Sequence, residues 1–98
     1  MKATALIQRR VIIAADAFVE IVVWSVPKPV LGSFHVFKYR LAYVVAGDCV
    51  LRYDNESGKG DHKHIGKTET RYIFKNPDSL VADFLTEVER WNHENGRT

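Results

Sequence analysis

The sequence predicts an α+β fold in which an antiparallel sheet of about five strands carries a C-terminal helix on one face. Runs rich in β-branched residues alternate between two faces, short turns separate these runs, and one segment near the C-terminus has apolar residues at helical spacing. The chain has 98 residues, of which 46% are hydrophobic, so it has material for only one core. We therefore expect residues 1–98 to form a single domain.

The N-terminal part predicts a β-hairpin followed by a loop. In the segment RRVIIAADAFVEIVVWSV, β-branched residues dominate two runs, and residues 14–16 supply a short connection between them. Pro27 and Pro29 have no backbone N–H to donate to a strand ladder, and Gly32 permits a turn. We expect a loop that extends to about His35.

A second hairpin is expected from the segments KYRLAYVV and CVLRYD. They flank residues 46–48, where Gly47 can adopt the positive φ of a tight turn. Pairing across this turn would bring Arg40 into the neighbourhood of Asn55. The polar stretch at residues 53–66 is expected to be a loop, and TRYIF after it is expected to be the fifth strand.

The C-terminal segment predicts an amphipathic helix. Asn76 is a good N-cap, Pro77 suits the first helical position, and Asp78 places an acid where the helix dipole favours it. An apolar stripe with helical spacing follows, formed by Leu80, Val81, Phe84, Leu85, Val88 and Trp91. We expect this stripe to pack on the sheet.

Charge, cysteine content and hydropathy narrow the class of protein. A formal net charge of +2 is too small to indicate nucleic-acid binding by itself. Cys49 is the only cysteine, which excludes an internal disulfide and fits a reducing compartment. The apolar run at residues 17–24 contains Glu20 and is far shorter than the ~20 residues that span a bilayer. We expect a soluble, cytoplasmic protein that makes no membrane contact.

The polar stretch YDNESGKGDHKHIG contains the groups that phosphodiester chemistry needs. His62 and His64 are a pair of side chains that titrate near neutral pH and could transfer protons. Tyr53 could stack on a base or donate its hydroxyl. The cations available to bind the phosphate are Lys59, Lys63, Lys38, Arg40 and Arg52.

Two other interpretations of this stretch remain open. In extended backbone His62 and His64 would point to one face and could share a metal ion with Asp61, Asp54 or His35. A set of three or four ligands cannot be assembled with confidence, so we expect neither a metal nor another cofactor. The stretch could also be an ordinary solvated connection between strands.

The second strand of the first hairpin suggests a surface for a partner. Val19, Ile21 and Val23 would point to one face of the sheet. The other face would carry an apolar patch beside Glu20, formed by Phe18, Val22 and Trp24. Exposed patches of this kind usually contact a partner, here another protein or a second copy of the chain in a homodimer.

Most of the chain resembles a known family. The segments VPKPVLGSFHVFKYRLAYVVAGDCVLRYDNESGKGDHKHIG and VADFLTEVERW resemble the small TumE-type toxins of bacterial and archaeal toxin–antitoxin systems. The most specific parts are GSFHVFKYRL, YDNE and KGDHKHIG. The resemblance implies a cytoplasmic toxin whose partner is a DNA-binding antitoxin encoded next to it, of helix-turn-helix type.

The resemblance also extends the set of candidate site residues. The expected catalytic residues become His62, His64, Asp61 and Tyr53. The expected substrate-binding residues become Lys59, Lys63, Arg40, Lys38, His35, Asp54 and Asn55. The resemblance itself supplies no reaction mechanism.

Three functions remain open on the sequence alone. The first is a metal-independent ribonuclease toxin that uses the histidine pair. The second is a toxin that binds RNA or a ribosomal surface without cleaving it. The third is an interaction module in which the histidines are structural. A catalytic site would gather the histidines and the cations in one pocket, whereas a binding surface would spread the cations over a flatter patch.

Overall fold

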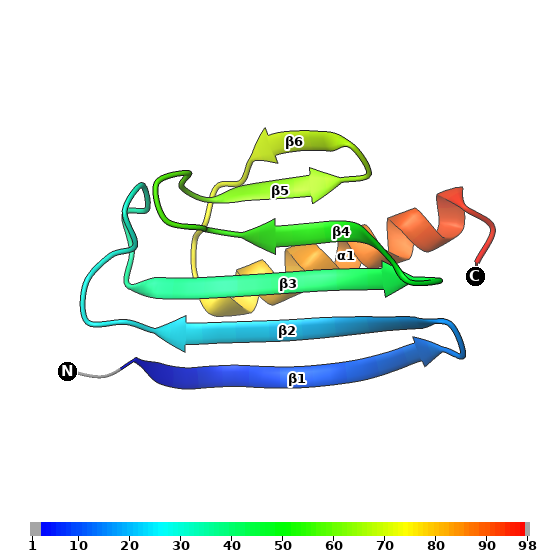
Figure 1. Ribbon diagram of the computed structural model, residues 1–98, viewed down its shortest axis with the longest axis horizontal. Coiled ribbons are helices and arrows are strands. Elements are labelled where there is room, and N and C mark those ends of the chain that lie inside the picture. The colour runs from blue at the N-terminus through cyan, green and yellow to red at the C-terminus, as the bar shows by residue number, and fades with distance from the viewer. Residues whose placement is uncertain (1–2, 98) are drawn as a thin grey trace.

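The computed structural model describes residues 3–97, which form a six-stranded antiparallel sheet with one helix on one face (Figure 1). The elements are β1 (Thr4–Ala14), β2 (Ala17–Ser25), β3 (Phe37–Val45), β4 (Asp48–Asp54), β5 (His62–Ile65), β6 (Thr68–Arg71) and α1 (Pro77–Glu94). Each strand pairs with the next one along the chain, in the order β1-β2-β3-β4-β5-β6. The predicted α+β class with a docked C-terminal helix is confirmed.

The third hairpin corrects the sequence-based prediction at the far edge of the sheet. The segment expected to be one long loop contains β5, and β6 ends at Arg71, before the apolar part of TRYIF. A turn at Gly66, which has a positive φ of 60°, joins the two strands. Both strands are only four residues long and mostly polar, so the pairing of β5 with β4 and of β6 with β5, rather than strand propensity, determines their structure.

The alternation expected in β2 is confirmed and defines the two faces of the sheet. Val19, Ile21 and Val23 are buried on the face that carries α1, whereas Phe18 and Glu20 are half-buried on the opposite face. We call these the covered face and the open face. The largest fully buried side chains of the sheet lie on the covered face and are Tyr43, Tyr53, Leu41, Leu51, Val19 and Val23.

The helix begins as predicted. The Asn76 side chain accepts a hydrogen bond from the Ser79 N–H at 2.8 Å, and Pro77 follows it as the first helical residue. From the expected stripe, Leu80, Phe84 and Val88 are buried.

The position of the helix leaves one side of the covered face less protected. α1 packs mainly against β3 and β4, and the Tyr43 hydroxyl donates to Asn92 Oδ1 at 2.6 Å. Leu85, on the side of α1 that faces β1, stays 40% exposed. In the part of the chain that the structure describes, no helix is both long and apolar enough to cross a membrane.

Candidate functional site

The register of β4, β5 and β6 assembles a ladder of charged and polar side chains on the open face. Arg52 lies opposite His64, and Asp54 lies opposite His62. Across the next strand pair, Glu69 lies opposite His64. Residues that are directly opposite in an antiparallel pair share a face, so these side chains form one surface.

His62 is the most enclosed member of this ladder. It is only 4% exposed, and its Nδ1 lies 2.9 Å from the Gly60 carbonyl oxygen, which can only accept, so Nδ1 donates. Nε2 lies 2.6 Å from Asp54 Oδ1, at an angle that leaves both atoms outside hydrogen-bond geometry. His62 is therefore a buried partner of Asp54 and does not reach the surface.

Arg52 connects this buried pair to an accessible histidine. Its Nε lies at an ion-pair distance of 2.9 Å from Asp54 Oδ2, also outside hydrogen-bond geometry, and its Nη2 lies 3.0 Å from His64 Nε2. Because a guanidinium has no acceptor, His64 Nε2 must be the unprotonated acceptor in this contact. The His64 side chain is 23% exposed, and Glu69 Oε2 lies 3.7 Å from the same nitrogen. The ring of His64 stands nearly perpendicular to that of His62, with the centroids 4.9 Å apart.

A small cationic hollow adjoins Arg52 at the ends of β3 and β4. It has a volume of about 270 Å³, and Lys38, Arg40 and Arg52 line it together with Asp54 and Asn55. Arg40 lies opposite Asp54 in the register, one residue from the expected Asn55, so the predicted neighbourhood is confirmed. Glu56 lines it as well, so three cations face two acids, which leaves a small excess of positive charge for a phosphate group.

His35 and Asp61 lie in a separate network at one end of the sheet. Asp61 accepts hydrogen bonds from Ser33 Oγ at 2.6 Å, His35 Nε2 at 2.6 Å and Tyr39 Oη at 2.8 Å. His35 Nδ1 accepts the Phe37 N–H, so Nε2 is the protonated nitrogen that donates to Asp61. Burial, and then the hydrogen bond to Asp61, raise the pKa of Tyr39 far above its usual range.

Asn55 completes this network and is fully buried. Its Oδ1 accepts the Tyr39 N–H at 2.9 Å, and its Nδ2 donates to the Phe37 carbonyl at 2.7 Å and to Ser33 Oγ at 3.2 Å. With its hydrogen-bonding groups engaged inside the protein, the side chain has nothing to offer a substrate.

Two glycines let the loops of this network approach closely. A Cβ on Gly32, whose φ is +97°, would lie 2.7 Å from the Gly60 nitrogen. A Cβ on Gly60 would in turn lie 2.9 Å from the Gly32 carbonyl oxygen. The network therefore joins the loop before β3 to the loop before β5. His35 and Asp61 also line a pocket of about 500 Å³ at this end of the sheet, together with Lys59, Arg71 and Tyr72.

Tyr53 and Lys63 lie on the covered face, away from His64. Tyr53 is 2% exposed, and burial followed by the charge of Glu87 raises its pKa to about 12, so its hydroxyl stays protonated at neutral pH. Lys63 Nζ lies 3.8 Å from Glu87 Oε1 on α1. Lys59 is exposed in the loop before β5, where its Nζ lies 3.9 Å from Glu56. The structure thus separates the expected site residues into three groups.

One residue of the ladder was absent from the sequence-based set. Glu69 follows the turn at Gly66, and the pairing of β5 with β6 brings it to His64. The potential metal ligands of His62, His64 and Glu69 lie within 4.8 Å of one another, so these three side chains could hold a cation. The guanidinium of Arg52 already contacts both Asp54 and His64 there, and its positive charge opposes a metal ion in the same place.

Comparisons with known proteins agree with the resemblance seen in the sequence. A family model described as "Toxin TumE" matches residues 2–92. No curated protein and no solved structure matches the chain significantly. Because the family model covers nearly the whole chain, the protein belongs to the TumE toxin family.

Proposed function

We propose that this toxin acts on RNA at the open face of the sheet, where His64 exchanges protons with the substrate and Arg52 holds the reacting phosphate. The observation that carries this function is the contact between Arg52 Nη2 and His64 Nε2 at 3.0 Å. It pairs an accessible imidazole with a phosphate-binding guanidinium, beside the hollow lined by Lys38 and Arg40.

The proposed reaction needs no group that the chain lacks. The RNA 2′-hydroxyl attacks the adjacent phosphorus while His64 Nε2 takes its proton, and the bond to the 5′-oxygen breaks. The products are a 2′,3′-cyclic phosphate and a 5′-hydroxyl, whose proton comes from water, and the protonated His64 returns its proton to the solvent. Arg52 stabilises the charge that develops on the phosphate oxygens. When its guanidinium turns to the phosphate, the lone pair of His64 Nε2 becomes free to act as the base.

His62 has a positioning role in this reaction. It is buried against Asp54, and Asp54 Oδ2 lies 2.9 Å from Arg52 Nε. This chain of contacts fixes the stem of the guanidinium without bringing His62 to the substrate. The original hypothesis of two equivalent histidines is therefore narrowed to one histidine that contacts RNA and one that supports the arginine.

The partner of this toxin follows in general terms from its family. Membership in a toxin family implies an antitoxin partner. We propose that this antitoxin is a DNA-binding protein of helix-turn-helix type, encoded by the adjacent gene, and that both proteins act in the cytoplasm. Induced expression of the toxin alone should slow growth, and co-expression of the adjacent gene should restore it.

The test is cleavage of a defined, end-labelled RNA by the purified chain, with and without a chelator. We expect cyclic phosphate ends, no effect of the chelator, and no cleavage of DNA of the same sequence, which lacks the 2′-hydroxyl. His64→Gln should reduce the rate by about 10²–10⁴-fold. His93→Gln, an exposed histidine near the end of α1, is the matched control and should cut at the normal rate.

Two outcomes would overturn the proposed chemistry. Activity that the chelator abolishes and a divalent ion restores would assign the site to a metal held by His62, His64 and Glu69. A wild-type chain that stops growth but cuts no RNA would select the second candidate, a toxin that binds RNA without cleaving it. The burial of His62 favours this second candidate, because cleavage by a histidine pair needs two accessible histidines and the ladder has one, His64.

A further inference from the structure

We propose that the groove between β1 and α1 is the site at which the antitoxin binds. Its occupant is an extended segment that pairs with β1 as a seventh strand, places apolar side chains in the groove, and directs a carboxylate toward Arg9.

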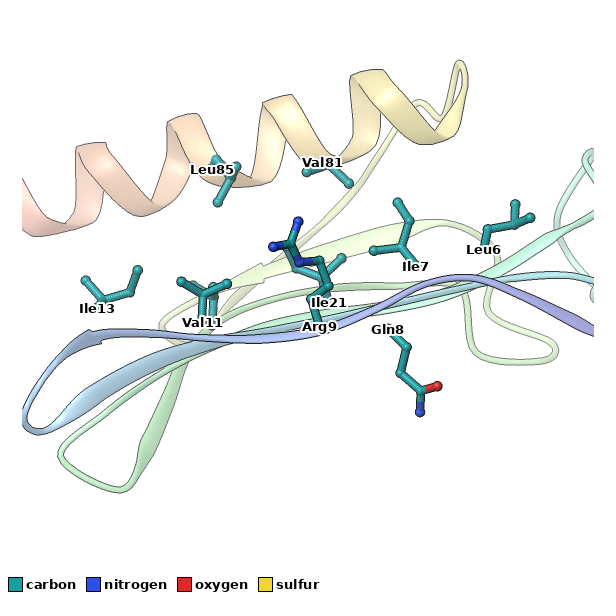
Figure 2. Close-up of a pocket in the computed structure, with 10 residues that line it drawn as sticks. Leu6, Ile7, Gln8, Arg9, Val11, Ile13, Ile21, Val81 and Leu85 are labelled. Atoms are coloured by element: carbon teal, nitrogen blue, oxygen red, sulfur yellow. The ribbon is translucent and has the colours of Figure 1, made fainter.

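The groove exists because α1 lies over β3 and β4 and leaves β1 beside it uncovered (Figure 2). It has a volume of about 550 Å³, and its walls come from β1, β2 and α1. Four of its apolar residues stay substantially exposed: Leu6 at 49%, Val11 at 40%, Ile13 at 43% and Leu85 at 40%. An apolar surface of this kind, alongside a strand, is suited to a peptide whose alternate side chains fill it.

β1 is also a long edge strand, although Arg9, Arg10 and two irregularities in its register with β2 give it part of the usual protection. It has 11 residues, pairs only with β2 among the described strands, and contains neither proline nor an acid. The opposite edge, β6, has only four residues, and all four are polar or charged, in the sequence TETR. Short polar edges resist the addition of a strand, whereas a long apolar edge invites it. The two edges of this sheet therefore differ in the way expected if one of them receives a partner strand.

The charge of the groove indicates what the partner segment contains. Arg9 extends from β1 toward α1, on the same side as Ile7 and Val11, whereas Gln8 points away (Figure 2). Within residues 3–97, no carboxylate lies at ion-pair distance from Arg9. The neighbouring Arg10 is occupied on the open face, where its guanidinium lies 3.9 Å from the Phe18 ring centroid. A cation among apolar side chains is best complemented by a carboxylate from the segment that fills the groove.

A second copy of this chain fits the groove less well than an acidic partner. Symmetric antiparallel pairing of two β1 strands would bring the Arg9 and Arg10 pairs of both copies together at the centre of the new ladder. Like charges that face each other across strands are destabilising, and β1 has no acid to offset them. The segment therefore comes from a different protein, and it carries apolar residues two positions before and after an acid.

The half-buried patch on the open face is the competing surface. Phe18, Val22 and Trp24 are each partly covered, and Arg10 lies over Phe18. Beside this patch Ile12, opposite Phe18, is one apolar residue that is 67% exposed, whereas the groove has four apolar residues exposed by 40% or more.

The experiment measures binding of the purified antitoxin to wild-type chain, Arg9→Glu, Arg10→Glu and Leu85→Glu. Arg9→Glu and Arg10→Glu reverse the same charge on the same strand, but they act on opposite faces. We expect Arg9→Glu and Leu85→Glu to weaken Kd by about tenfold or more, and Arg10→Glu to change it by less than about threefold. Hydrogen exchange should show protection of the β1 amides in the complex.

Three results would overturn this assignment. The first is wild-type affinity in Arg9→Glu and Leu85→Glu together with unprotected β1 amides. The second is a larger loss in Arg10→Glu, which would move the antitoxin to the open face. The third is a wild-type chain that is dimeric alone and becomes monomeric in Arg9→Glu, which would make a second copy the occupant. RNA cleavage should be normal in Arg9→Glu, so failure here and failure of the proposed reaction are distinguishable.

Discussion

The two faces of the sheet use the same kinds of residue for opposite purposes. On the covered face, tyrosine hydroxyls donate hydrogen bonds to side chains of α1: Tyr43 donates to Asn92 and Tyr72 donates to Asp83. On the open face, Arg52, Asp54 and His64 contact one another and leave His64 accessible. In the first case polar atoms complete the packing of a core. In the second they form a surface that can receive a ligand.

Three consecutive residues of β5 show how sharply the faces divide. His62 and His64 lie on the open face, whereas Lys63 between them reaches the covered face and pairs with Glu87. Successive side chains of a strand point to opposite faces, so a cluster in the sequence is not a cluster in space. We expect function to follow the open face and stability to follow the covered face.

The largest expected effect is the loss of an aromatic ring from the covered face. Phe84 is fully buried and packs edge-on against Tyr53 at 5.4 Å between centroids. Phe84→Ala should lower the free energy of unfolding by about 3–5 kcal/mol. Phe18→Ala, on the open face, should cost clearly less. Urea denaturation of both variants measures this, and equal losses would show that the helix does not define the core.

His62 should behave as a structural residue although it lies on the open face. Replacing it with Gln leaves Asp54 buried with a weaker partner, so we expect a loss of about 1–3 kcal/mol in the free energy of unfolding. His64→Gln should change it by less than about 0.5 kcal/mol. This corrects the expectation that residues 53–66 form a loop, because both histidines lie in β5 and His62 is buried. Unchanged stability of His62→Gln in urea would contradict its enclosure.

The buried tyrosines should make the protein sensitive to alkali. Burial, followed by Glu87, raises the pKa of Tyr53 to about 12, and the pKa values of Tyr39 and Tyr72 are raised as well. An unfolded tyrosine titrates near pH 10, so the folded state binds these protons more tightly. Their contribution is fully present below pH ~10 and is lost as pH rises toward about 12.

Urea denaturation at a series of pH values checks this prediction. The free energy of unfolding should fall once pH exceeds about 10, and less steeply in Tyr53→Phe, which has no phenol to titrate at that position. An identical slope in both proteins would mean that Tyr53 titrates normally in the folded state.

The smallest expected effect concerns two lysines on opposite faces. Lys38 lines the cationic hollow on the open face, whereas Lys63 faces α1. Lys38→Ala should reduce the slope of log affinity for RNA against log salt by about 1, as expected for one lost phosphate contact. Lys63→Ala should leave this slope unchanged. Filter binding at several salt concentrations compares them, and the reverse result would place the RNA beside the helix.

Much of the fold was predictable from local patterns. The alternation in β2, the turn at Gly47 and the cap at Asn76 each act over a few residues, and each is confirmed. The third hairpin was missed because HKHI and TETR are short and mostly polar, so only the pairing of HKHI with β4 and of TETR with HKHI makes them strands. Once β5 is recognised, its alternation alone would have separated Lys63 from its two neighbours.

The grouping of the site residues was less accessible to sequence reasoning. Asp61 forms hydrogen bonds with Ser33 and His35, which are 28 and 26 residues away in the sequence. The two loops that carry these residues approach closely only because positions 32 and 60 are glycines. No periodicity in the sequence encodes such a contact. The residues of the polar stretch divide between a hydrogen-bonded network, the open face and the covered face.

The most direct measurement compares two residues that the sequence placed in one site and the structure places on opposite faces. It is the initial rate of cleavage of one defined RNA by His64→Gln and by Tyr53→Phe, each relative to wild type. We predict a loss of about 10²-fold or more for His64→Gln and a rate within about threefold of wild type for Tyr53→Phe. A normal rate in His64→Gln, or an equal loss in Tyr53→Phe, would contradict the assignment of the chemistry to the open face.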